Sequence, residues 1–209
     1  MFKKNIKNSD GLAASEKNSE DLEEARPSVG SFVTDLVKVL VVAVIAMLLF
    51  RYFIAEPFIV SGASMVPTYQ NKQYLVINKL GYRLHKPERG DVIVFRFPQN
   101  TKEFFIKRII GLPGEKVKVE NGHVVIYNEE HPAGEVLNEP YLEKQNITFG
   151  DSKIVTLGSD EYFVLGDNRS QSSDSRLWGI LPANDIVGKV FMRVFPPREF
   201  KFITDPVYP

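Results

Sequence analysis

The sequence predicts a mainly β protein in which one apolar transmembrane helix precedes an antiparallel β domain of many short strands. Two observations carry this prediction. An apolar run of helical length, LVKVLVVAVIAMLLFRYFI, occupies residues 36–54. From Glu56 onward the chain instead shows short β-type runs, separated by turn signals such as KPERGD, GLPGE, ENGH and GDNRS.

The first two segments are a tail and an anchor. Residues 1–33 are polar and without periodicity, and we interpret them as a cytoplasmic tail. Residues 34–54 are the predicted transmembrane anchor, because the helical run 36–54 would span about 28 Å, close to the thickness of a bilayer core. A buried core helix and a cleaved secretory signal are alternatives. A retained single span is favoured because Arg51 abuts the apolar core and no A-x-A cleavage site follows at the right distance.

The basic residues around this run bear on its orientation. Those before it predict a cytoplasmic N-terminus and a β domain on the outer face of the cell (plasma) membrane. They are Lys3, Lys4, Lys7, Lys17 and Arg26, with Lys38 at the entry. The bias is modest, since Arg51, Lys72 and Lys79 follow the apolar core. We therefore expect a single-pass protein with membrane lipid as a partner.

Residues 55–209 form the predicted extracytoplasmic β domain. Its expected strands cover 73–79, 91–97, 104–110, 116–120, 123–127, 161–166 and 186–195. Asn121-Gly122, between two alternating runs, indicates a tight hairpin. Residues 128–160 contain several prolines and glycines and are expected to be a long loop or insertion.

Composition excludes several functions. Among 209 residues, 26 Lys and Arg balance 26 Asp and Glu, so no basic excess indicates a nucleic-acid partner. There is no cysteine, which excludes thiol catalysis and disulfides. The histidines, His85, His123 and His131, show no metal-ligand spacing, so neither a metal nor another cofactor is expected.

Three segments contain residues suited to catalysis. In SGASMVPT (61–68), Ser64 lies between small residues and a turn, although such a serine is most often only a turn residue. In FFIKRII (104–110), strand alternation places one of Lys107 and Arg108 inward, and a buried lysine can lose its proton and act as a base. An edge strand with both side chains in solvent is the alternative. GDNRSQSSDSRLWG (166–179) is rich in loop-locking side chains, as many polar surface loops are.

Together these segments resemble the bacterial type I signal peptidases, the serine–lysine proteases of the S26 family. The resemblance runs from the anchor to Phe195, and the family's boxes occur in order as SGASMVPT, RGDVIVFR, FIKRIIGLPGE and GDNRSQSSDSRLWG. It implies a membrane-bound serine endopeptidase that needs no cofactor. Ser64 would be the acylating nucleophile and Lys107 the general base.

The resemblance also implies supporting roles. Ser172 would orient the lysine ammonium, and Asp174 and Arg176 would form a supporting ion pair. Gly166 would be the small residue beside the base. Some members carry a serine two residues before the nucleophile that donates to the oxyanion. This chain has Gly62 there, so its second oxyanion donor is left open.

The implied substrates are secretory precursor proteins with signal peptides, and the export machinery is a further candidate partner. An extended peptide could lie between PFIVSGAS and FFIKRII. The residues expected to line its pockets are Val60, Met65, Tyr69, Phe105 and Ile106. Two other functions are weighed against this one. The transmembrane span argues against a self-cleaving repressor-like protease, and the intact Ser64, Lys107 and Ser172 argue against a non-enzymatic β module.

Overall fold

The structure is a computed structural model that describes residues 29–53, 55–143 and 145–204. Residues 1–28 of the expected tail and Ile54 lie outside the described residues. The chain forms two compact units, Met1–Leu48 and Leu49–Pro209.

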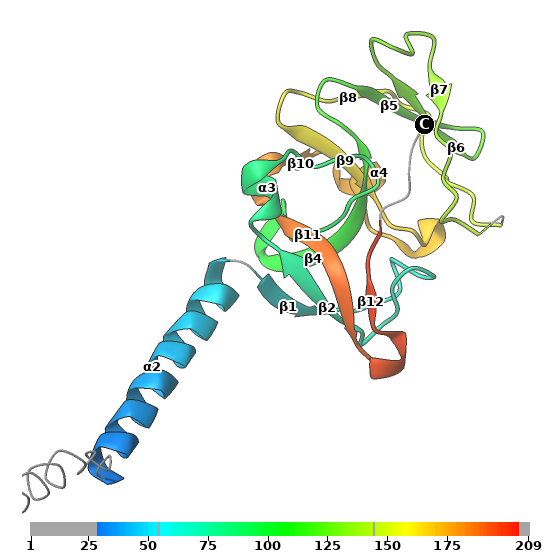
Figure 1. The fold of residues 1–209 in the computed structure, drawn as a ribbon. Coiled ribbons are helices and arrows are strands. Elements are labelled where there is room, and N and C mark those ends of the chain that lie inside the picture. Colours follow the sequence, from blue (N-terminus) through cyan, green and yellow to red (C-terminus); the bar gives the residue numbers. More distant parts are fainter. Residues whose placement is uncertain (1–28, 54, 144, 205–209) are drawn as a thin grey trace, which may run out of the picture. The chain divides into compact units, whose positions relative to one another are not determined.

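The helix α2, Val29–Phe53, contains residues 36–53 of the predicted apolar run (Figure 1). Its stretch Gly30–Leu48 is long and apolar enough to cross a membrane. All the side chains of residues 30–48 are exposed, including Val, Leu, Ile and Met on every side of the helix. A helix that is apolar all round is typical of a lipid environment or a protein core, and in the described residues the stretch Gly30–Leu48 is not buried by protein. The prediction of an N-terminal apolar helix is confirmed, and the helix begins at Val29, before the expected anchor.

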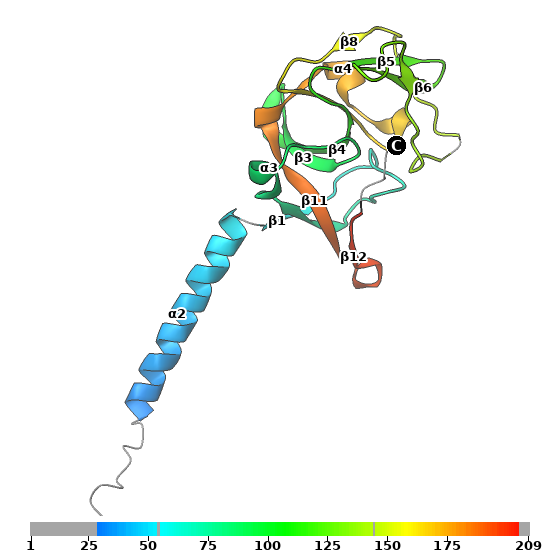
Figure 2. The same cartoon turned by 45° about the horizontal axis from the view of Figure 1, so that its top comes forward.

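The second unit is mainly antiparallel β, as predicted. In the larger sheet the strand order is β1-β2-β11-β3-β4-β9-β10, with β12 beside β11, and in the smaller it is β7-β6-β5-β8. Figure 2 shows β5, β6 and β8 close together, apart from β3, β4 and β11. The strands are β1 (Ala55–Ile59), β2 (Tyr74–Asn78), β3 (Val92–Phe97), β4 (Asn100–Gly111), β5 (Lys116–Glu120), β6 (His123–Tyr127), β7 (Glu135–Val136), β8 (Val155–Thr156), β9 (Glu161–Leu165), β10 (Leu181–Pro182), β11 (Ile186–Phe195) and β12 (Lys201–Phe202).

Short helices connect the strands. They are α3 (Gly81–Leu84), α4 (Ser175–Trp178) and the 3-10 turns η1 (Arg169–Gln171), η2 (Ala183–Asp185) and η3 (Pro197–Glu199). Both η1 and α4 lie in the segment 166–179, which follows β9 of the larger sheet.

Each of the seven expected strands is present. The predicted hairpin joins β5 to β6, and Asn121 and Gly122 have φ of 50° and 84°, the left-handed values that such a two-residue turn requires. The sequence did not indicate β1, where Pro57 argues against a strand. The structure places β1 at the edge of the larger sheet, where a proline is tolerated.

The expected loop 128–160 is mostly irregular, but it contains two short strands. The strand β7 pairs with β6, and β8 pairs with β5. Two-residue strands show no periodicity, so they could not be predicted. The segment therefore completes the smaller sheet.

The strand β4 positions the candidate site, because its two halves have different neighbours. Along Phe104–Arg108 it pairs with β3, and only Arg108–Gly111 pairs with β9. In the described part of the chain, no strand pairs with the other edge of residues 103–107. Both faces of its C-terminal half are covered, since Ile109 packs in one core cluster and Ile110 in another.

Candidate active site

Ser64 lies on the loop between β1 and β2, and its backbone is held by the loop that follows β9. The Asn168 N–H donates to the Ser64 carbonyl oxygen at 2.9 Å, and Asn168 Nδ2 donates to the Ala63 carbonyl oxygen at 3.1 Å. Gly62 has a φ of +93°, a conformation that residues with a Cβ rarely adopt. These contacts fix the turn that presents the serine hydroxyl.

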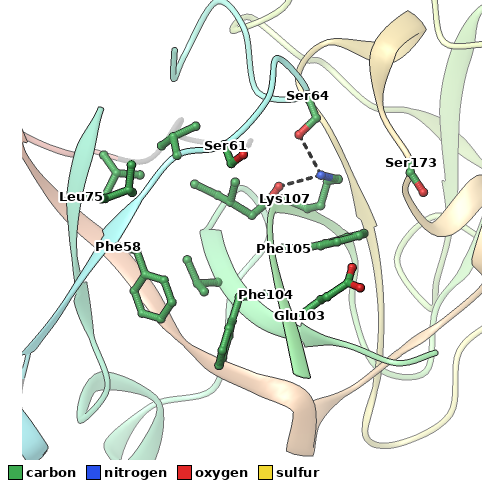
Figure 3. Close-up of a pocket in the computed structure, with 13 residues that line it drawn as sticks. Phe58, Ser61, Ser64, Leu75, Glu103, Phe104, Phe105, Lys107 and Ser173 are labelled. Carbon is green, nitrogen blue, oxygen red and sulfur yellow. Dashed lines mark hydrogen bonds between the residues drawn. The ribbon is translucent and has the colours of Figure 1, made fainter. Parts of the chain in front are cut away.

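Lys107 reaches this hydroxyl from the middle of β4. Its Nζ lies 2.9 Å from Ser64 Oγ and 2.9 Å from the Ile106 carbonyl oxygen (Figure 3). A neutral amine has two N–H groups and one lone pair. It can therefore donate to the carbonyl and still accept the serine proton, which is the geometry that a general base needs.

Burial lowers the pKa of Lys107 from 10.5 to about 8. The residue is 4% exposed, and loss of hydration is the largest cause of the shift. The negative charges of Asp174 and Asp167 act in the opposite direction and raise the pKa. Near pH 8 about half of the amines are therefore unprotonated, whereas an ordinary lysine is almost fully charged at that pH.

Gly166 and Ser172 pack against the serine loop. A Cβ on Gly166 would lie 2.2 Å from Ser172 Oγ and 2.5 Å from the Ser64 carbonyl oxygen, so no larger residue fits there. Ser172 Oγ is buried and has no hydrogen-bond partner among the described residues. A buried hydroxyl left without a partner lowers stability. Ser172 thus lies close to Ser64 and Lys107, but in the described contacts it forms no hydrogen bond with Lys107.

Asp174 and Arg176 form the expected ion pair. Arg176 Nη2 lies 2.7 Å from Asp174 Oδ2, and Arg176 Nε lies 2.8 Å from Asp174 Oδ1. The carboxylate is fully buried and also accepts the Gly166 N–H at 3.1 Å. Arg176 Nη2 in addition donates to the Arg169 carbonyl oxygen at 2.7 Å. The pair therefore holds the loop after β9 at both its start and its middle.

A second ion pair, between Arg108 and Asp167, is not predicted by the sequence analysis. Arg108 Nε and Nη2 lie 2.9 and 2.6 Å from the two Asp167 oxygens, and Thr68 Oγ1 donates to Asp167 Oδ2 at 2.5 Å. Strand alternation predicted that only one of Lys107 and Arg108 points inward. Both are buried because β4 is covered on both faces. The pair ties the strand of the lysine to the loop of the serine.

The segment 128–160 contributes a third link. Arg169 is buried and pairs with Glu139, with its Nη1 2.9 Å from Glu139 Oε2. Asn146 accepts the Arg169 N–H at 3.1 Å and donates to the Asp167 carbonyl oxygen. The expected insertion thus supports the loop that surrounds the dyad, although none of its side chains lies beside Ser64 Oγ in the described contacts.

A groove of about 390 Å³ adjoins the dyad. Three of the five expected substrate-binding residues, Val60, Phe105 and Ile106, line it. Met65 and Tyr69 do not, which corrects the expectation for them. Their side chains are 1% and 0% exposed within an apolar core. The full lining is Phe58, Ile59, Val60, Ser61, Ser64, Leu75, Val94, Glu103, Phe104, Phe105, Ile106, Lys107 and Ser173.

Donors for an oxyanion are partly defined. The Ser64 N–H has no hydrogen-bond partner among the described residues, so it can face a developing negative charge. The Gly62 N–H is engaged, since it donates to Asn71 Oδ1 at 3.2 Å. Within the described ranges, no group of three or more His, Cys, Asp or Glu side chains is arranged to hold a metal ion.

Comparisons with known proteins agree on one family. The family model described as signal peptidase, peptidase S26, matches residues 33–195. A protein named probable signal peptidase I-1, from Synechocystis sp., is 36% identical over 183 residues, covering 83% of this chain and 88% of its own. Probable signal peptidase I-2 of the same organism is 38% identical over 82% of this chain and 77% of its own. Signal peptidase IB of Staphylococcus aureus is 32% identical over 79% of this chain and 91% of its own.

Replacing Lys107 by Met is expected to stabilise the protein at pH 7. Because the folded-state pKa is below the ordinary value, holding the ammonium in the fold costs stability below pH 8, and that cost fades between pH 8 and 10.5. The shift corresponds to about 3 kcal/mol, which is the upper limit of the gain. Urea unfolding followed by near-UV circular dichroism measures it.

Arg108→Met is the matched control on the adjacent residue. It removes the partner of a fully buried Asp167 carboxylate, so we expect a loss of about 3–5 kcal/mol. If Lys107→Met destabilises the fold to a similar extent, the amine is not strained by its burial.

Gly166→Ala is expected to lower activity by about 100-fold or more, because the new methyl group must displace the Ser64 backbone or Ser172. Peptide cleavage and thermal unfolding are measured together. Gly81→Ala serves as control, since its Cβ would meet only the end of the Asn78 side chain, at 3.2 Å. Full activity of Gly166→Ala would mean that the loop can shift without harming the dyad.

Proposed function

The chain belongs to the signal peptidase family, peptidase S26, and we propose that it is a membrane-bound serine endopeptidase that removes N-terminal signal peptides from exported precursor proteins through a Ser64–Lys107 dyad. The observation that carries the proposal is the 2.9 Å approach of Lys107 Nζ to Ser64 Oγ, with the lysine buried and its pKa lowered to about 8. A nucleophile, a base that is about half unprotonated near pH 8 and an adjoining groove are parts that amide hydrolysis requires.

In the proposed acylation step, neutral Lys107 takes the Ser64 proton while Oγ attacks the scissile carbonyl carbon. The Ser64 N–H stabilises the oxyanion that forms. The ammonium then protonates the leaving amine, so that the C–N bond breaks and an ester to Ser64 remains. A water molecule gives a proton to Lys107 and attacks the ester carbonyl carbon. As the ester C–O bond breaks, the Lys107 ammonium protonates Ser64 Oγ, which regenerates the serine hydroxyl and the neutral amine and releases the new carboxylic acid.

The free edge of β4 supports binding of the precursor as an extended peptide. Residues 103–107 line the groove, and their edge away from β3 is unpaired in the described structure. On the other side, the groove is lined by residues 58–61, at the end of the edge strand β1. An added strand could pair with such an edge through main-chain hydrogen bonds, while the side chains of Val60, Phe105 and Ile106 would form shallow apolar pockets.

The apolar helix α2 supports attachment to the membrane. Its span Gly30–Leu48 matches a bilayer core in length. We propose a single pass in the plasma membrane, with a cytoplasmic N-terminus and the β domain outside, because several Lys and Arg residues precede the span. This arrangement holds the dyad close to membrane lipid, where signal peptides present their cleavage sites, and makes the export machinery a candidate partner.

Ser64→Ala and Lys107→Ala are each expected to lower cleavage of a signal-peptide precursor by about 10⁴-fold or more, because each removes one half of a unit. Full-length protein in detergent is assayed by gel shift and mass spectrometry of the product. Ser159→Ala, in a surface turn, is the control. Normal processing by either dyad variant would exclude the proposed mechanism.

The rate of cleavage, measured as kcat/KM, is expected to rise with pH with a midpoint near 8, since only the unprotonated lysine accepts the serine proton. Asp174→Asn should move the midpoint to lower pH, because the Asp174 charge raises the pKa of Lys107. The profile is recorded from pH 6 to 10, with the fold checked by circular dichroism. A flat profile, or a shift to higher pH in Asp174→Asn, would contradict a lysine base.

A further inference from the structure

Glu103 lies in the groove wall on the same strand as the proposed base. Residues 103, 105 and 107 alternate onto one face of β4, and Figure 3 shows the Glu103 carboxylate near Phe105, further along the strand from Lys107. Its Oε1 accepts a hydrogen bond from Asn100 Nδ2 at 2.7 Å. In the described part of the chain Glu103 forms no ion pair, and its side chain is exposed.

Among the described residues that line the groove, Glu103 is the only acidic one. Of the residues that line it, only Glu103 and Lys107 are of charged types. A base must be neutral when it accepts a proton, so in the reactive state Glu103 is the only charge among the lining residues. The neighbouring Lys102 is exposed and, by strand alternation, points to the opposite face of β4. A peptide in the groove therefore meets one unpaired carboxylate.

The spacing along β4 sets which part of a peptide meets it. Glu103 is four residues from Lys107, about 13 Å along an extended strand. A substrate strand paired with the free edge of β4 has the same rise per residue as β4. The substrate residue beside Glu103 is therefore about four positions from the scissile bond. The groove walls are mostly apolar, which fits the apolar side of a signal-peptide cleavage site, N-terminal to the cut.

We propose that Glu103 is a specificity-determining residue, which favours substrates with Lys or Arg four or five residues before the scissile bond, beyond the small residues of the A-x-A site. This inference rests on the proposed function. The interaction is that of a solvent-exposed ion pair, so its effect on kcat/KM is about two- to fivefold at low ionic strength, and salt weakens it.

The test uses full-length protein in detergent and a set of otherwise uncharged signal-type peptides. Each peptide carries a single Lys at one position from two to seven residues before the cut, and a matched peptide carries Gln there. The readout is the ratio of kcat/KM for the Lys and Gln peptides, at 20 mM and 500 mM salt. It is measured for the wild type, Glu103→Gln and Glu103→Lys. The matched control is Glu129→Gln, which changes an exposed glutamate after β6, outside the groove.

We expect the wild type and Glu129→Gln to prefer Lys at one position within the window, at low salt only. Glu103→Gln should abolish the preference, and Glu103→Lys should reverse it. A Lys preference that survives in Glu103→Gln, or its absence from the wild type, would overturn the assignment.

A binding measurement distinguishes failure of the Glu103 assignment from failure of the proposed function. The peptides' dissociation constants are measured by fluorescence anisotropy on Ser64→Ala with and without Glu103→Gln. If the wild type cleaves no peptide, the proposed function fails. The Lys-over-Gln ratio in affinity then still decides whether Glu103 selects a basic residue, because that ratio must be lost in the double variant.

Discussion

The burial of the Lys107 amine is the constraint on which the rest of the site depends. If Lys107 were exposed to water, it would be almost fully protonated near neutral pH and could not act as a base. Its burial in the middle of β4 keeps the proton weakly held, and the nearby carboxylates of Asp174 and Asp167 limit how far the pKa falls. Desolvation and charge act in opposite directions here, and desolvation is the larger effect.

This constraint explains why so many charged groups surround the dyad without touching the reacting atoms. Asp167 and Asp174 are fully buried, yet each is bound by an arginine with two hydrogen bonds, so neither stays unpaired. The two arginines come from different places, Arg108 from β4 and Arg176 from α4. The Arg108–Asp167 pair joins the strand that carries the lysine to the loop after β9, and the Arg176–Asp174 pair holds that loop in shape. Movement of the strand relative to the loop would therefore break a buried ion pair.

Much of the fold could be predicted from the sequence, because alternation and turn residues are local signals. The strands β5, β6 and β11 match the predicted ranges, as does the hairpin at Asn121-Gly122. The two-residue strands carry no such signal. The roles proposed for Ser64 and Lys107 rest on the resemblance to a family, since neither residue is distinctive alone.

The positions of Met65 and Tyr69 and the Arg108–Asp167 ion pair depend on tertiary contacts, which a local sequence pattern does not contain. Tyr69 donates its N–H to the Met65 carbonyl oxygen at 2.8 Å, so the chain after Ser64 curls through one turn and directs both side chains into the core instead of the groove. Asp167 lies 59 residues from Arg108 in sequence. Only the pairing of Arg108 with Leu165 across β4 and β9 brings it within reach.

The unpaired edge of β4 has a consequence beyond peptide binding. An open strand edge can pair with the same edge of a second molecule, which is a common start of aggregation. Lys102 and Glu103 stand on opposite faces of this edge, and charged side chains at such positions discourage close pairing of identical strands. The edge can thus stay open without pairing with the same edge of a second molecule, and the charged residues that keep it open are not the proposed catalytic ones.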